Sequence, residues 1–456
     1  MKKSAFKIDM SSGNIAKDAL LFSLPILLSS WLQLLYNAAD LITCGQFGSE
    51  HAIGAIAATN SLTSLIISLF LGFSVGANVL IATAFGAKEK EKSARIIGSA
   101  YALALASGIV LAIVGVSCSR YFLKIMEPPS EIFELSNLYM MIYFAGIPFT
   151  LIFNFGSALM RGMGNTMKPF LFLAFAGVVN VGLNLLFVIV FHMDVAGVAT
   201  ATVIAQAISA ILVTISLIRN KSLFANLKIK AIRFHKEETL GIVRIGVPAG
   251  IQSALFSLSN VILQKSINAF GANAVSGVGA ESSIESFMST GVDSFAQASV
   301  AFVGANYGAK NIARVKKSIF LISLYGLIFT AAMGTFAYFL ARPLLRIYTD
   351  NPIAIDYGAE KLQLVAACYT VYALMSTTSS AIRGFGYSVT PMIVSLLGIC
   401  VLRIAYIYAL FPLPEFHSIF GLYLSYPLSW GATLVANLIC FFPLSRKAFA
   451  KIKPAA

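Results

Sequence analysis

The stretch LFSLPILLSSWLQLLYNAADLITCGQFG, residues 21–48, places a carboxylate, Asp40, in a segment that is otherwise suited to span a membrane. The run 19–39 before it carries no charge. About 20 residues at about 1.5 Å each are enough to cross a hydrocarbon core of about 30 Å. A charge at this depth costs at least about 2.5 kcal/mol, so an acid there faces a bundle interior or a water-filled cavity. The stretch therefore predicts a membrane helix that carries a functional acid.

Polar side chains precede Asp40 at helical spacing. Offsets of three, four and seven residues place side chains on one face of a helix, and this face carries Gln33, Tyr36, Asn37 and Asp40. Because such a stripe cannot face lipid, we predict that Gln33, Tyr36 and Asn37 contact the substrate in a cavity beside Asp40.

The composition is that of an all-α integral membrane protein. The 456 residues are 58% hydrophobic and 11% charged, with a mean hydropathy of +0.82, whereas about a quarter of the residues in a soluble protein are charged. The five scattered cysteines predict neither a disulfide framework nor a metal motif. Apolar runs between polar turns predict twelve spans: 19–44, 53–83, 96–117, 136–159, 169–192, 195–218, 242–267, 274–303, 319–341, 361–382, 390–412 and 418–444.

The basic residues indicate the topology. With a cytoplasmic amino terminus, 26 of the 33 lysines and arginines fall in inside segments, 5 in outside loops (Lys361 among them) and 2 within spans. This asymmetry places both termini in the cytoplasm of a multi-pass inner-membrane protein. The formal net charge of +14 thus reflects topology and contact with the lipid bilayer rather than binding to nucleic acid.

The two halves of the chain repeat each other at an offset of 222 to 223 residues. Pro25 matches Pro248, and the turn RGMGNTMKP at 161–169 matches RGFGYSVTP at 383–391. Each half holds six spans, so both halves enter the membrane in the same sense, related by a pseudo-two-fold axis along its normal. We predict an amino-terminal lobe at 1–218, a basic cytoplasmic linker at 219–240 and a carboxyl-terminal lobe at 241–456, with the site between the lobes.

Four polar residues of the amino-terminal lobe share one depth range in the membrane. Counted inward at about 1.5 Å per residue, Asp40, Asn180, Asn184 and Thr202 all lie in the outer half of three spans. Their carboxylate, amide and hydroxyl groups suit a small cation such as Na⁺, and equally suit an acid that binds a proton. The alternative is that they only form hydrogen bonds between helices.

The carboxyl-terminal lobe carries more charges inside its spans. Lys265 could pair with Glu281, Glu285 lies one turn deeper on the same face, and Arg403 and Asp293 lie further in. Three acids against two bases leave one negative charge in excess, which predicts a site for a cationic substrate at Glu281, Glu285 and Arg403. The alternative is a structural ion-pair network.

Several motifs together resemble those of the multidrug and toxic compound extrusion (MATE) transporters. They are LYNAADLITCGQFG, the paired turns FGAKEKEKSAR and YGAKNIARVKK, and the twin RGxG loops, and the likeness covers about residues 15–445. The resemblance implies a two-lobed antiporter that exports organic, often cationic, compounds in exchange for Na⁺ or H⁺. It also implies that Asp40, Asn180, Asn184 and Thr202 form the cation site, where the residue matching Asn184 is often an aspartate.

Other function classes fit less well. No G-x-x-x-x-G-K-[ST] loop is present to use ATP, so an ion gradient must drive transport. All four histidines fall in loops, which argues against an intramembrane enzyme. A receptor or channel would leave the repeat unexplained. The alternative within the same superfamily is a lipid-linked oligosaccharide flippase, whose cavity would be broadly cationic.

The predicted mechanism needs no cofactor. Asp40 has no basic residue in the first six spans to hold it as an anion, so it could take up a proton from outside and release it inside. This favours H⁺ over Na⁺ as the coupling ion. We further predict a monomer that exports small cationic or amphipathic molecules.

Overall fold

The computed structural model describes residues 8–49, 51–126, 128–219 and 232–452. Eight of the twelve predicted spans lie within a single helix, whereas 169–192, 319–341, 390–412 and 418–444 cross from one helical segment to the next or run past a helix end. The first half contains α1 (Ile15–Phe47), α2 (Ala52–Gly86), α3 (Lys90–Met126), α4 (Ser130–Gly162), α5 (Met167–Leu185) with the π-helical η1 (Leu186–Val190), and α6 (Asp194–Ile218).

The second half contains the corresponding helices with more interruptions. They are α8 (Lys236–Asn268), α9 (Ala272–Gly308), α10 (Ile312–Phe339), α11 (Ala341–Leu345), α12 (Pro352–Gly384), α13 (Val389–Ser395) with η3 (Leu396–Val401) and α14 (Leu402–Ala409), α15 (Ile419–Tyr423) and α16 (Ser425–Ile452). Within the described residues, ten helical segments are long and apolar enough to cross a membrane. The long helices α9 and α12 are not among these ten segments, and they carry the buried charges Glu281 and Lys361.

The turns confirm the internal repeat at the level of backbone conformation. Gly164 and Gly386 both adopt the left-handed region, with φ of 85° and 88°, and Lys88 and Lys310 do so with φ of 60° and 56°. In each RGxG turn the glycine nitrogen donates to the carbonyl of the arginine, over 2.9 Å at Gly164 and 2.7 Å at Gly386. Both pairs are 222 residues apart, so each half ends two of its helices in the same way.

The helices form two compact units. Of the described residues, Ile8 and those within 28–250 form the first unit, and those within 9–27 and 251–452 form the second. The division therefore falls inside α1 and α8, rather than in the predicted linker 219–240, of which 220–231 lie outside the described residues.

Close helix packing explains why the start of α8 belongs to the first unit. A Cβ atom at Gly72 or Gly76 of α2 would overlap the backbone of α8 at Gly250 or Ile242. Small residues at these positions let two helices approach closely. In the second unit the start of α1 packs through Phe22, whose ring meets that of Phe302 edge-on at 5.3 Å.

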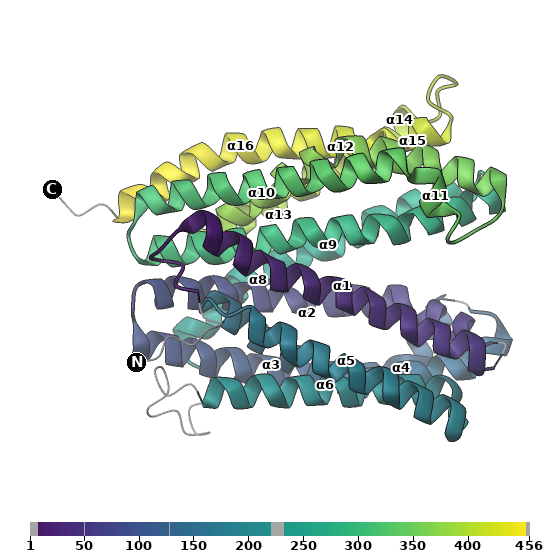
Figure 1. The fold of residues 1–456 in the computed structure, drawn as a ribbon, viewed down its shortest axis with the longest axis horizontal. Helices are drawn as coiled ribbons and strands as arrows, with labels where there is room; N and C mark the ends of the chain where they lie inside the picture. Colours follow the sequence, from purple (N-terminus) through teal and green to yellow (C-terminus); the bar gives the residue numbers. More distant parts are fainter. Residues whose placement is uncertain (1–7, 50, 127, 220–231, 453–456) are drawn as a thin grey trace. The chain divides into compact units, whose positions relative to one another are not determined.

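Each unit has one helix that packs against three others, and Figure 1 labels these two helices α4 and α12. In the first unit α4 packs against α2, α3 and α6, and in the second unit α12 packs against α9, α10 and α16. Apolar side chains such as Phe144 and Leu151 fill the first core, and Leu362 and Tyr369 fill the second. The cores hold the polar residues described next in fixed positions.

Candidate functional site

The four polar residues predicted at one depth of the amino-terminal lobe contact one another. The Nδ2 atom of Asn184 on α5 donates to Asp40 Oδ1 on α1 over 2.5 Å, and the hydroxyl of Thr202 on α6 donates to Asp40 Oδ2 over 3.2 Å. Asn180 Nδ2 donates to Thr202 Oγ1 over 3.3 Å. Three helices thus supply one hydrogen-bonded set, which we call the Asp40 cluster.

Burial separates the Asp40 cluster from ordinary surface polar contacts. Asn184 and Asn180 are only 0% and 4% exposed, and Asp40 itself is partly buried. Among the described residues, the ion pairs leave Asp40 without a basic partner, and the amide oxygen of Asn184 is buried without a hydrogen-bond donor. A carboxyl group surrounded only by neutral partners can change its charge without leaving an opposite charge uncompensated.

The other members of the α1 stripe do not join the cluster. The hydroxyl of Tyr36 donates to the carbonyl oxygens of Leu173 and Ala174 on α5 at 3.3 Å each, and its ring occupies the position that a Cβ at Gly177 would take. Gln33 and Asn37 are exposed. Tyr36 therefore packs α1 against α5, and substrate contact by these three residues stays a prediction.

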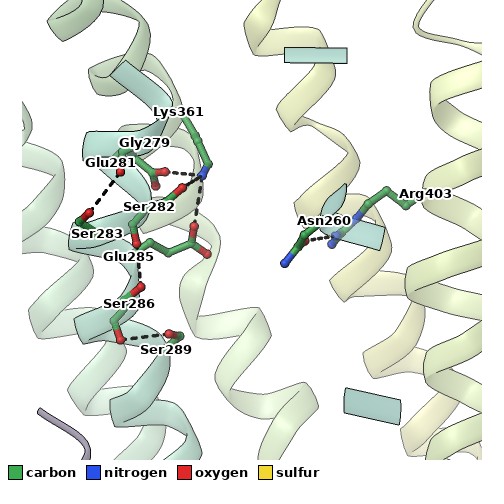
Figure 2. A network of polar contacts seen from close by, with 10 residues as sticks. All are labelled: Asn260, Gly279, Glu281, Ser282, Ser283, Glu285, Ser286, Ser289, Lys361 and Arg403. Carbon is green, nitrogen blue, oxygen red and sulfur yellow. Dashed lines mark hydrogen bonds and ion pairs between the residues drawn. The ribbon is translucent and has the colours of Figure 1, made fainter. Parts of the chain in front are cut away.

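A buried lysine joins the two glutamates of the carboxyl-terminal lobe. Lys361 on α12 forms an ion pair with Glu281 and a second one, over 3.3 Å, with Glu285, both on α9. Its Nζ also donates to the hydroxyl of Ser282 over 3.2 Å. Figure 2 shows both carboxylates turned toward Lys361. We call these three charged residues the Lys361 triad.

The triad corrects two predictions. Lys265 is exposed and is not the partner of Glu281. Lys361, predicted to lie in an outside loop, is only 3% exposed, because α12 begins at Pro352 rather than at 361. The sequence did hold a signal for the earlier start: the side chain of Asn351 caps the helix and proline occupies its first position.

Arg403 lies on α14 with neutral partners. Its Nη1 donates to Ser259 Oγ over 3.4 Å and to Asn260 Oδ1 over 3.3 Å, and its Nη2 donates to Ser429 Oγ over 3.1 Å. The ring of Tyr426 covers the guanidinium at 4.2 Å. Figure 2 shows Arg403 in its own contact with Asn260, apart from the contacts of the triad. Among the described ion pairs, Glu285 pairs with Lys361 and not with Arg403.

A cavity of about 300 Å³ lies between these groups inside the carboxyl-terminal lobe. Its charged lining residues are Glu285, Lys361 and Arg403. Its aromatic lining residues are Phe256, Tyr369, Tyr372, Tyr426 and Trp430. An aromatic wall with a few convergent polar groups is typical of a small-molecule site.

The charge count behind the predicted cationic site changes with these placements. Asp293 is exposed and is not among the residues that line the cavity. The two glutamates of α9 face one lysine and one arginine, so the cavity region has no excess of acids. Arg383, which begins the second RGxG turn, donates to the side chain of Gln252. The excess of one acid counted from the sequence therefore does not hold around the cavity. That the substrates are cationic stays a prediction.

Comparison with known proteins identifies the family. The MatE family model matches residues 25–186 and 248–409, once in each half. This chain belongs to the MatE family. It is 26% identical over 396 residues to the "Probable multidrug resistance protein YpnP" of Bacillus subtilis (strain 168), covering 87% of this chain and 88% of that protein.

Other relatives and solved structures resemble this MatE protein over most of its length. The "Multidrug export protein MepA" of Staphylococcus aureus (strain NCTC 8325 / PS 47) is 23% identical, covering 83% of this chain and 81% of that protein. A crystal structure of MATE in complex with MaL6 superimposes with a TM-score of 0.89 at 20% identity, covering 99% of both chains. These likenesses confirm an all-helical, multi-pass membrane fold in two repeated halves.

Sequence reasoning missed the polar partners of Arg403 in this MatE protein. Ser259 and Asn260 lie on α8 and Ser429 on α16, so only the folded chain brings them to α14. Serine and asparagine are also common inside membrane helices for packing alone. No local pattern marks them as partners of a buried arginine.

Proposed function

We propose that this MatE protein is a transporter, not an enzyme: a secondary active antiporter that exports small organic compounds and is driven by protons through Asp40. Family membership and relatives named as multidrug resistance and export proteins support efflux. The observation that carries the coupling role is the contact set of Asp40, an intramembrane acid whose hydrogen bonds within the described part of the chain come from Asn184 and Thr202. Such an acid is a functional site by default.

The hydrogen bonds of the Asp40 cluster favour H⁺ over Na⁺. Asn184 and Thr202 both present donors to the carboxylate, whereas a bound Na⁺ requires oxygen acceptors turned toward the same point. An amide suits both states of an acid, because its nitrogen donates to a carboxylate and its oxygen accepts from a carboxylic acid. Rotation of the Asn184 amide would let the cluster hold Asp40 in either state.

Proton binding would change the packing of the amino-terminal lobe. The charged acid draws α5 and α6 toward α1 through donors, and neutral Asp40 gives up the charge-assisted part of those bonds. A proton taken from outside and released inside would therefore bias the lobe between two arrangements. Alternating access coupled in this way exports a substrate as the proton enters.

The proposal also covers the oligomeric state, location and substrate class of the transporter. The chain acts as a monomer in the inner membrane with both termini cytoplasmic, needs no cofactor, and exports amphipathic substrates through the aromatic cavity. Na⁺ remains the other coupling ion that the oxygens of Asn180, Asn184 and Thr202 could hold. A flippase for lipid-linked oligosaccharides gains no support, because the cavity's Lys361 already pairs with two glutamates.

The test is Asp40→Asn in proteoliposomes with an imposed proton gradient. We expect export of a fluorescent amphipathic dye to fall to the level of empty vesicles, while the purified variant still binds the dye. Glu134→Gln is the matched control: it removes an exposed acid of the same unit, paired with Arg120 on the surface. If Asp40→Asn still exports against a gradient, or if a Na⁺ gradient at constant pH drives the wild type, the proton mechanism is wrong.

A further inference from the structure

Of the charged residues that line the cavity, Glu285 and Lys361 pair with each other, whereas Arg403 is in none of the described ion pairs. Its side chain is 1% exposed, and its hydrogen bonds go to two serine hydroxyls and one amide oxygen. Within the described residues its Nε atom is buried without an acceptor. By contrast, the cavity's other base, Lys361, contacts both glutamates of the triad.

The guanidinium of Arg403 therefore has no acidic partner in direct contact within the described part of the chain. A buried charge is stable only when it is paired and hydrogen-bonded, and neutral acceptors satisfy the hydrogen bonds without balancing the charge. The planar guanidinium matches a carboxylate or sulfonate in shape, because two parallel N–H groups can donate to two oxygens. Tyr426 covers one face of the group at 4.2 Å, so incoming acceptors meet its edge.

The rest of the cavity suits an aromatic body attached to that anion. Tyr369, Tyr372, Tyr426 and Trp430 form a connected cluster, with Tyr372 and Trp430 at 5.1 Å and Tyr426 and Trp430 at 5.5 Å between ring centroids. The volume of about 300 Å³ lies at the lower end for drug-sized ligands. A single substituted ring fits such a space, with its faces or edges against the cluster.

We propose that the carboxyl-lobe cavity binds small aromatic anions, with the carboxylate or sulfonate on Arg403 and the ring against Tyr372 and Trp430. The proposal rests on the proposed function, since it names a substrate class for the exporter. It differs from the cationic class predicted from the sequence. A cation would have to share Glu285 with Lys361, which already lies 3.3 Å from that carboxylate.

The test compares three probes that share one ring: 4-nitrobenzoate, 4-nitrobenzamide and 4-nitrobenzylammonium. Nitroaromatic rings quench tryptophan fluorescence, and the chain has two tryptophans, so a Trp31→Phe background leaves Trp430 as the reporter inside the cavity. We expect the purified protein in detergent to bind the anion about tenfold to a hundredfold more tightly than the neutral amide, as hydrogen bonds to charged groups allow.

Variants assign that preference to Arg403. Arg403→Gln should bring the anion and the amide within about threefold of each other, while Lys265→Gln, which removes an exposed base of α8, should leave the preference unchanged. Arg403→Lys keeps the charge without the planar fork, so it should keep part of the preference even if Arg403→Gln does not fold.

Three outcomes would overturn the proposal. The first is wild-type protein that binds the amide or the ammonium probe as tightly as the anion, which needs no variant. The second is a preference that survives Arg403→Gln. The third is displacement of 4-nitrobenzoate by dihexanoyl phosphatidylglycerol at lower concentrations than by unlabelled 4-sulfobenzoate, which would assign Arg403 to a lipid headgroup. Because binding is measured without a gradient, its failure is distinct from failure of proton coupling at Asp40.

Discussion

The two lobes share a fold but place different chemistry at matching positions. At the repeat offset, Asp40 corresponds to Leu263, Asn184 to Tyr406, and Arg403 to Val181. The amino-terminal lobe holds one acid among neutral donors, whereas the carboxyl-terminal lobe holds two acids and two bases around an aromatic cavity. The repeat therefore preserves turns and close helix packing, and leaves the interior side chains free to specialise.

Asp40 has only neutral partners among the described residues and can change its charge, whereas Glu281 and Glu285 are paired with Lys361. Neutralising Asp40 leaves its partners with ordinary hydrogen bonds, because neither Asn184 nor Thr202 is charged. Neutralising Lys361 leaves the carboxylates of Glu281 and Glu285 without a base. Neutralising Arg403 changes the charge of the cavity. This contrast assigns coupling to the first lobe and substrate recognition to the second, and the predictions below can break it.

The largest effect is expected for Lys361→Met, which leaves the buried Glu281 and the partly buried Glu285 without the base that pairs with them. Removing one partner of a buried ion pair lowers the free energy of unfolding by about 3–5 kcal/mol. Denaturant or thermal unfolding in detergent measures it. The matched control Lys265→Met removes an exposed lysine and should change stability by less than about 0.5 kcal/mol.

Asp40→Asn sharpens the same comparison from the other lobe. Its hydrogen bonds can be remade by an amide, so the cost should be about 1 kcal/mol. If Asp40→Asn destabilised the protein as much as Lys361→Met, the view of Asp40 as an uncommitted acid would be wrong.

The sequence predicted the features that depend on local pattern. Span positions follow from apolar runs, and the Asp40 cluster follows from depth, because helices of known rise place Asp40, Asn184 and Thr202 at one level. Lys361 was placed outside because hydropathy marks only the apolar part of α12, and the helix begins nearer the Asn351 cap. The neutral partners of Arg403 come from α8 and α16, and no sequence pattern joins helices so far apart.

A second, smaller effect is expected when the amino-terminal lobe gains a carboxylate. Asn184→Asp would place a second acid within hydrogen-bond distance of Asp40, where the present amide donates over 2.5 Å. Two carboxylates with Thr202 form a better site for a small hard cation, so Na⁺ binding should tighten by about tenfold or more and a Na⁺ gradient should drive export at constant pH.

The matched control for that change is Gln46→Glu. It adds the same charge to α1 at an exposed position outside the cluster and should leave coupling unchanged. Calorimetry of Na⁺ binding and vesicle transport measure both variants. Equal Na⁺ effects from the two would mean that added negative charge in this lobe, and not the geometry of the Asp40 cluster, selects the ion.

The last prediction changes no function and concerns whether both lobes enter the membrane in the same sense. Met193 and Glu415 are exposed, lie 222 residues apart and precede matching helices. Moving Lys361 from a loop to the helix interior reduces the outside basic residues from 5 to 4 against 26 inside, so the charge asymmetry is stronger than the sequence count suggested. Both positions should therefore face outward.

Labelling with an impermeant maleimide in a background whose five cysteines are replaced by alanine can measure this. In intact cells Met193→Cys and Glu415→Cys should both react, whereas the exposed Lys90→Cys and Lys447→Cys should react only after permeabilisation. Opposite behaviour of Met193→Cys and Glu415→Cys would mean that the lobes are inverted relative to each other. A full reversal of all four would keep the parallel repeat and place the termini outside, so that Asp40 would meet the cytoplasmic half of the membrane and protons would have to enter the cluster from the opposite side.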